Sequence, residues 1–188
     1  MKVEVSREIS VSPEDFYDYM VGSVCEQINI ELQTNMKPED IKSGYTHKLK
    51  QTNNKGKTEK IRYTIKEAKR PHAFTTVYTS AARKTTLRYT FEPGPRGGTV
   101  VTYSQETIFA DPSADTSNAM TIRHGKSKIA RQIANAERDC RARLRAQGRQ
   151  AQTEPVQDDP QAVQAPDEGT APVEKKKSSG WAGLFKKK

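Results

Sequence analysis

The chain has few of the side chains that carry metal or nucleophilic chemistry. Its 188 residues include two cysteines, one tryptophan and three isolated histidines, His47, His72 and His124. A zinc site needs three or four converging ligands, and neither a His-x₃-His nor a Cys-x₂-Cys spacing is present. A Gly-x-Ser-x-Gly nucleophile turn is also missing. We therefore expect no metal, no cofactor and no enzymatic activity.

Long apolar runs are absent as well. No apolar run of signal-peptide length opens the chain, and no segment approaches the roughly 20 apolar residues that span a bilayer. The two cysteines, Cys25 and Cys140, fall on apolar faces of predicted helices, where a free thiol behaves as a small hydrophobe. We expect both thiols to be reduced and buried, which is typical of a cytoplasmic protein.

The C-terminal part of the chain is poor in large apolar residues. Residues 149–179 consist mainly of Gln, Ala, Pro, Asp and Glu, and such a segment cannot offset its ordering entropy by burial. The net charge of the chain is +9, yet residues 151–174 carry only acids and residues 175–188 carry only lysines. Because these two stretches nearly cancel, the positive balance belongs mostly to the folded part.

What is present is an ordered series of secondary-structure patterns. Residues 2–10 alternate, 12–34 have helical spacing, 43–109 alternate in several runs, and 118–147 return to helical spacing. The gaps between the alternating runs fit hairpins and are too short for the crossover connections of a parallel sheet. The order predicts an α+β fold in which a curved antiparallel β-sheet grips a long C-terminal helix, followed by a disordered tail.

Three units are expected along the chain. An α+β domain spans 1–148, a disordered Pro- and acid-rich linker spans 149–179, and a basic-aromatic tip spans 180–188. Ser12 is expected to cap the first helix, and Gly148 to end the second.

Motifs throughout the first unit resemble a known family. The matching stretches are Lys2-Val3-Glu4-Val5, Pro13-Glu14-Asp15-Phe16-Tyr17-Asp18-Tyr19, Ser23-Val24, Ile41-Lys42-Ser43-Gly44-Tyr45, Leu87-Arg88-Tyr89-Thr90-Phe91-Glu92-Pro93 and Val101-Thr102-Tyr103. They are similar to the bacterial domain of unknown function numbered 3284, over roughly residues 1–145. The resemblance implies the START-like (SRPBCC, helix-grip) superfamily, which includes polyketide cyclases and lipid-transfer domains. It supplies no catalytic residue, and the acidic extension with its basic tip departs from the family's usual short form.

The strand patterns place aromatic residues on one face. The candidate pocket residues are Tyr45, His47, Tyr63, Tyr89 and Tyr103. The parity of Tyr103, like that of Tyr78, is ambiguous. Inward tyrosines give an apolar wall whose hydroxyls need partners, so a ligand pocket of mixed polarity is one interpretation. The other is a sheet that closes on the helix and leaves no cavity, with His47 as a hydrogen-bonded core residue.

Basic residues occupy the opposite face of the same strands. They are Lys48, Lys50, Lys60, Arg62, Lys66, Lys84 and Arg88. Binders of single-stranded nucleic acid interleave such charges with exposed aromatic residues, and here the aromatic residues have the opposite parity. We expect a solvated face and no specific nucleic-acid partner.

The terminal tip suggests a contact outside the domain. Its apolar residues Trp181, Leu184 and Phe185 fall on one face of a single helical turn. They are flanked by the lysines Lys175, Lys176, Lys177, Lys186, Lys187 and Lys188. Each lysine near an anionic leaflet contributes on the order of 1 kcal/mol, so weak contact with the inner face of the membrane is one interpretation. A peptide read by a protein partner and a solubilising tail without a target are the others.

Two functions follow from these patterns. The first is binding of a hydrophobic or amphipathic, lipid-like small molecule, with the tip touching an anionic membrane surface. The alternative is an adaptor with a filled core that engages a protein partner through its tail.

Overall fold

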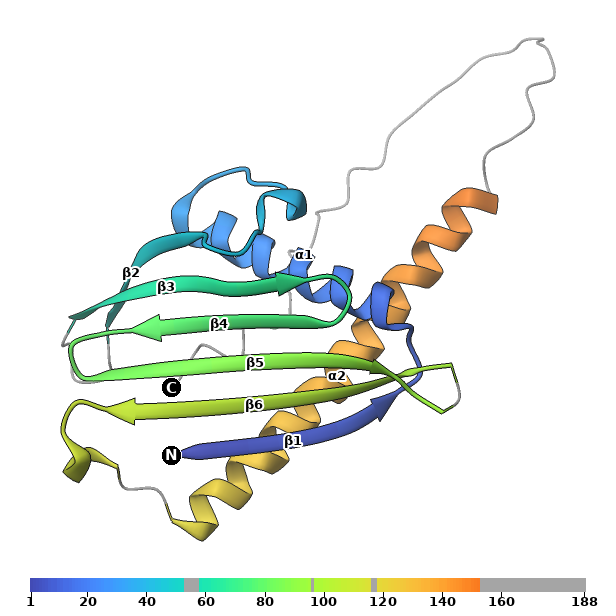
Figure 1. Ribbon diagram of the computed structural model, residues 1–188. Coiled ribbons are helices and arrows are strands. Elements are labelled where there is room, and N and C mark those ends of the chain that lie inside the picture. The colour runs from blue at the N-terminus through green and yellow to red at the C-terminus, as the bar shows by residue number, and fades with distance from the viewer. Residues whose placement is uncertain (53–57, 96, 116–117, 153–188) are drawn as a thin grey trace, which may run out of the picture.

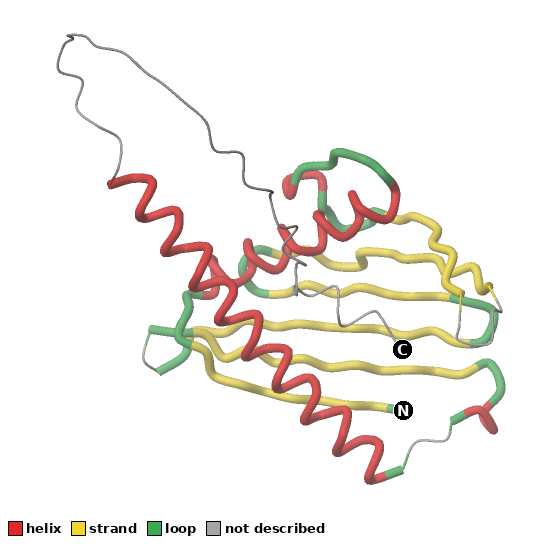
Figure 2. The backbone as a smooth tube through the Cα atoms, turned by 180° about the vertical axis from the view of Figure 1, so that it is seen from behind, coloured by secondary structure: helices red, strands yellow, loops and turns green. Residues whose placement is uncertain are grey.

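Six strands form one antiparallel sheet, and two long helices cover its inner face (Figure 1 and Figure 2). The computed structural model describes residues 1–52, 58–95, 97–115 and 118–152. The elements are β1 (Lys2–Ile9), α1 (Pro13–Leu32), η1 (Pro38–Asp40), β2 (Thr46–Thr52), β3 (Thr58–Lys69), β4 (Ala73–Thr79), β5 (Arg83–Pro93), β6 (Thr99–Phe109), η2 (Pro112–Ala114) and α2 (Ala119–Gln152). The predicted α+β fold, with its antiparallel sheet and long C-terminal helix, is confirmed.

The strand order explains how the helices come to lie on one face. The order is β1-β6-β5-β4-β3-β2, so β1 and β2 form opposite edges although they are consecutive strands. The chain must cross the sheet between them, and α1 is the element that does so (Figure 1). After β6, α2 crosses the same face and lies against β1 and α1 (Figure 2).

The first helix begins where its capping residues predict. The Ser12 side chain accepts a hydrogen bond from the Asp15 backbone N–H at 3.2 Å, and Pro13 occupies the first turn. Beyond the helix, the Asn29 side chain accepts from the Met36 N–H at 2.7 Å and donates to the Met36 carbonyl at 2.9 Å. This double hydrogen bond fixes the connection that leads toward β2.

The second helix is longer than the sequence predicts. Its buried stripe consists of Ile129, Ile133, Ala136 and Cys140. The helix continues through Gly148 to Gln152, so the expected stop at Gly148 is wrong. A lone glycine costs a helix only about 1 kcal/mol, and no proline follows within the next turn to end it. Cys140 and Cys25 are both buried free thiols, as predicted.

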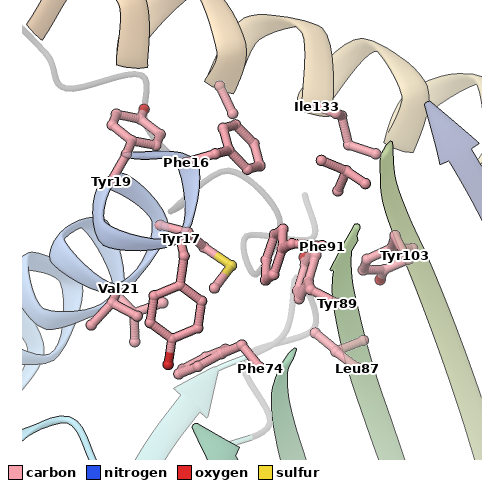
Figure 3. Close-up of a cluster of buried hydrophobic side chains, with 14 of the residues drawn as sticks. Phe16, Tyr17, Tyr19, Val21, Phe74, Leu87, Tyr89, Phe91, Tyr103 and Ile133 are labelled. Atoms are coloured by element: carbon pink, nitrogen blue, oxygen red, sulfur yellow. The ribbon is translucent and has the colours of Figure 1, made fainter. Parts of the chain in front are cut away.

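The core lies between the inner face of the sheet and the two helices (Figure 3). Phe16 and Tyr17 of α1 both meet the Phe91 ring edge-on, with ring centroids 6.0 Å and 5.8 Å away. Ile133 reaches the core from α2 and is 1% exposed. Contacts of this kind contribute about 1.5–3 kcal/mol for each large apolar side chain that is fully buried. They hold both helices against the sheet.

The opposite face of the sheet carries the predicted basic residues, and all seven are exposed. The predicted tip, 180–188, and the predicted linker, 149–179, lie outside the described residues, apart from the last four residues of α2. In the part of the chain that the structure describes, no helix has both the length and the apolar character needed to cross a bilayer.

Candidate ligand-binding site

A row of rings runs across the β2 half of the inner face. His47 on β2 lies directly opposite Tyr63 on β3, which in turn lies opposite Tyr78 on β4. The His47 and Tyr63 ring centroids are 4.9 Å apart, and those of Tyr63 and Tyr78 are 5.0 Å apart. The Tyr45 ring, just before β2, lies 5.4 Å from His47. Because directly paired strand residues project from the same face, the register alone brings these rings together.

A second pair of rings lies on the β5 and β6 strands. Tyr89 and Tyr103 are directly opposite, with ring centroids 4.9 Å apart. Burial raises the pKa of Tyr89 well above its ordinary value, and the neighbouring Tyr103, Tyr78 and Tyr63 raise it further. The pKa of Tyr63, Tyr78 and Tyr103 is raised by burial in the same way. The four phenols therefore stay protonated, and none brings a negative charge to this face.

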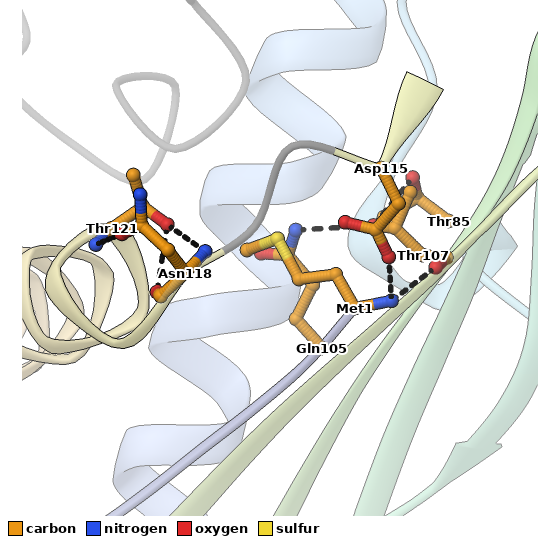
Figure 4. Close-up of polar contacts among 7 residues, drawn as sticks. All are labelled: Met1, Thr85, Gln105, Thr107, Asp115, Asn118 and Thr121. Atoms are coloured by element: carbon orange, nitrogen blue, oxygen red, sulfur yellow. Dashed lines mark hydrogen bonds and ion pairs between the residues drawn. The ribbon is translucent and has the colours of Figure 1, made fainter. Parts of the chain in front are cut away.

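A hydrogen-bonded chain extends from Tyr103 along β6, and Figure 4 shows its part from Gln105 to Thr107 and Thr85. The Tyr103 hydroxyl donates to Gln105 Oε1 at 2.8 Å, and Gln105 Nε2 donates to Thr107 Oγ1 at 3.4 Å. Thr107 Oγ1 lies 3.2 Å from Thr85 Oγ1 on β5. The Met1 amino group donates to the Thr107 carbonyl at 2.9 Å. This end of the inner face is polar, and its polar groups already have protein partners.

The His47 imidazole differs from that network. Both of its ring nitrogens are buried, and neither has a hydrogen-bond partner among the described residues. Burial lowers the pKa of His47, so the ring is neutral at pH 7 and presents one N–H donor and one acceptor. Leaving a buried polar group without a partner costs about 1–3 kcal/mol. The ring is thus placed to gain a hydrogen bond from any molecule that reaches it.

The α2 helix contributes a second polar atom of this kind. Gln132 Oε1 is buried and has no hydrogen-bond partner within the described ranges. Its neighbours in the helix, Ile129 and Ile133, are buried in the core. The inner face of the sheet and the helix that covers it therefore each carry an acceptor that no described residue satisfies.

The structure brings the predicted pocket residues onto one face. Tyr63, Tyr89 and Tyr103 are 4%, 3% and 1% exposed, while Tyr45 and His47 are half-buried at the β2 edge. The sequence did not identify Tyr78, because residues 73–77 of β4 are all buried and show no alternation. It also did not identify Gln132, which has no periodic signal. The position of Tyr78 opposite Tyr63 could have been inferred from the register of the β3–β4 hairpin.

No metal-binding cluster of three or more His, Cys, Asp or Glu residues occurs in the residues that the structure describes. His72 lies exposed in the turn before β4, and His124 lies exposed near the start of α2.

A family model shows which family the chain belongs to. Its description is "Domain of unknown function (DUF3284)", and it matches residues 1–122, well over half of the chain. The chain belongs to the DUF3284 family. The match confirms the family expected from the sequence motifs. No curated protein matches the sequence.

Solved structures show the same fold at low sequence identity. The crystal structure of Ara h 8.0201 is 14% identical, has a TM-score of 0.50, and aligns over 76% of this chain and 98% of its own. An uncharacterised Rhizobium leguminosarum protein is 13% identical, has a TM-score of 0.52, and aligns over 76% of this chain and 95% of its own. The DUF3284 chain thus has the Bet v1-like, START-like helix-grip fold.

Proposed function

We propose that this DUF3284 chain binds a neutral amphipathic small molecule between the inner face of its sheet and its helices, without catalysing a reaction. The observation that carries the proposal is the His47 imidazole, whose two buried nitrogens have no partner within the described residues. A ligand hydroxyl, carbonyl or amide would satisfy at least one of them, and the helix-grip fold supports the position of the site between sheet and helix.

The chemistry of the walls supports a neutral ligand. Among the residues that the structure describes, none of the buried ones is a lysine or arginine, so they offer no cation to balance a ligand carboxylate. The phenols are protonated because burial raises their pKa. Leu87 and Ile133, which are buried on the sheet and on α2, offer apolar surface to the body of the ligand. These properties favour a hydroxylated or carbonyl-bearing apolar molecule over a fatty acid.

Tyr45 is the side chain best placed to admit such a molecule. Its ring lies beside His47 at the sheet edge and is half-buried, whereas Tyr63 on the next strand is 4% exposed. Both nitrogens of His47 are covered, so a ligand must displace a neighbouring ring to reach them. Turning out an edge residue disturbs fewer core contacts than moving a central one.

The test is binding of a panel of neutral and acidic amphipathic molecules, together with native mass spectrometry of the purified full chain to find co-purified ligand. We expect neutral members to bind, and His47→Phe to weaken them about two- to tenfold, since a hydrogen bond contributes about 0.5–1.5 kcal/mol. His72→Phe is the matched control, because His72 is exposed outside the site. Absence of binding by every member, or equal binding by both variants, would refute the proposal.

The membrane contact of the terminal tip is a separate part of this proposal. Its support is the sequence of the tip, in which Trp181 and Phe185 lie between two lysine triplets. Such a tip would bring the ligand-binding domain close to an anionic bilayer, where an amphipathic molecule could be exchanged.

A further inference from the structure

The hairpin formed by β2 and β3 places like charges directly opposite each other. Lys48 is paired with Arg62, and Lys50 is paired with Lys60, on the outer face of the sheet. Directly paired positions have Cβ atoms about 5 Å apart, so the four cations form a compact cluster, here called the cationic hairpin face. All four side chains are exposed.

This arrangement is locally unfavourable, because like charges directly opposite on a sheet destabilise the pairing. None of the four cations forms an ion pair with any other described residue. Lysines commonly protect an edge strand from pairing with another chain, and this accounts for Lys48 and Lys50 on β2. It does not account for Lys60 and Arg62, because β3 is an internal strand. An anion that spans the four side chains would relieve the repulsion.

We propose that the acidic segment 154–174 of the same chain docks on the cationic hairpin face. The segment contains six acids and no lysine or arginine, namely Glu154, Asp158, Asp159, Asp167, Glu168 and Glu174. It begins two residues after the described end of α2, so both partners are held on one molecule. The proposal concerns the outer face, so it does not depend on ligand binding at the inner face.

The length of the segment is sufficient for this contact. Residues 153–174 span up to about 75 Å when extended, which exceeds the roughly 50 Å length of α2, the longest element. A covalent tether of this length gives an effective concentration in the millimolar range, so even weak ion pairs are populated. The contact must be sensitive to salt, because exposed charges are screened within about 10 Å at 0.1 M ionic strength.

Two alternatives fit less well: docking of the acidic segment on α2, and binding of nucleic acid to the cationic hairpin face. The exposed cations of α2 are distributed around a helix, so they cannot gather on one flat surface as those of the hairpin do. Nucleic acid lacks stacking partners here, because the outer-face residues between the cations of β3 and β5 are threonines such as Thr64 and Thr86. A tethered acidic segment needs charge alone.

The experiment compares the backbone amide NMR spectra of the full chain and of a chain truncated after Gln152. At low ionic strength we expect shift differences at the outer-face residues of β2 and β3, which disappear in about 1 M NaCl, where the screening length is only about 3 Å. A peptide of residues 153–174 added to the truncated chain should reproduce the same shifts.

Two matched variants of the truncated chain locate the surface. Replacing Lys48, Lys50, Lys60 and Arg62 by Gln should weaken the peptide roughly tenfold or more, since four exposed ion pairs are lost. Replacing Arg123, Lys126, Lys128 and Arg131 of α2 by Gln removes the same charge and should change its affinity by less than about twofold. Identical spectra for the full and truncated chains would overturn the proposal. So would equal peptide binding by the hairpin variant, or hairpin shifts that only anionic vesicles produce.

Discussion

At the scale of single residues, the polar groups of the inner face differ in whether a described residue offers them a hydrogen bond. Gln105 links Tyr103 to Thr107 through two hydrogen bonds. His47, across the sheet, has neither ring nitrogen paired with a described residue. A core selected for stability alone would favour an apolar residue at such a position, because an unpaired buried imidazole is unfavourable. The imidazole is therefore the residue whose presence most needs a function.

The lowered pKa of His47 predicts a pH dependence of stability. The unfolded state, with a His pKa near 6.5, binds more protons than the folded state once the pH falls below about 7. Above the unfolded-state pKa, His47 is neutral in both states and its protonation does not lower the free energy of unfolding. As the pH falls toward the folded-state pKa, protonation favours the unfolded state and the free energy of unfolding decreases. His47→Phe removes this loss, so the variant should gain stability relative to the wild type between about pH 7 and pH 5.

Urea unfolding midpoints of the two proteins at both pH values measure this difference, because the two proteins differ in no titratable group other than His47. A constant difference between His47→Phe and the wild type across this range would contradict the lowered pKa.

The limits of sequence reasoning are also clearest at single residues. Tyr45, His47, Tyr63 and Tyr89 alternate with exposed basic residues, so their face could be predicted from parity. Tyr78 could not, because both faces of β4 are buried around it: Thr75 and Thr76 are 5% and 3% exposed. A period-two pattern disappears wherever the residues on both faces of a strand are buried.

At the scale of elements, the helices are defined more by their buried stripes than by their ends. The beginning of α1 could be predicted because Ser12 and Pro13 are local signals. The end of α2 could not, because Gly148 is a weak stop that the rest of the helix tolerates. The sequence indicates the stripe of α2 well, since Ile129, Ile133 and Cys140 recur at helical spacing and all are buried.

The stripe of α2 makes a quantitative prediction. Ile133 is 1% exposed, so Ile133→Ala should lower the free energy of unfolding by about 3 kcal/mol through lost apolar burial and the cavity left behind. Ile108 on β6 is 59% exposed and offers the same substitution without a core contact. Ile108→Ala should change the free energy of unfolding by less than about 1 kcal/mol.

Urea denaturation of both variants tests whether α2 is an integral part of the domain. The family model ends at residue 122, close to the beginning of this helix. Equal stability losses for the two variants would mean that the helix contributes little to the core. A large loss for Ile133→Ala alone would show that the folded unit of this chain extends beyond the region that the family model matches.

At the scale of the whole molecule, the topology separates two surfaces with different chemistry. The strand order puts consecutive strands β1 and β2 at opposite edges, so α1 must cross the sheet between them, and α2 packs on the same face and leaves the other open (Figure 2). The covered face collects the aromatic residues, and the open face collects the cations. A proposed ligand and a proposed acidic segment can therefore bind at the same time, on opposite sides of one sheet.

The sequence of the tip predicts a third contact, whose strength depends on the charge of the partner. Six lysines near an anionic leaflet would contribute several kcal/mol in total, at about 1 kcal/mol each, and the apolar residues Trp181, Leu184 and Phe185 would add to this. We expect the full chain to float with anionic liposomes at low salt, and a truncation after Glu174 to stay behind. Neutral liposomes should recover neither.

A variant separates the apolar and the electrostatic parts of this contact. Replacing Trp181, Leu184 and Phe185 by Ser keeps all six lysines, so it should reduce recovery from anionic liposomes without abolishing the salt dependence. Because the acids of 154–174 lie between the domain and the tip, neutralising them should increase recovery if the segment also repels the leaflet. Equal recovery of the full chain and the Glu174 truncation would refute membrane contact, while leaving the ligand site and the docking surface to their own tests.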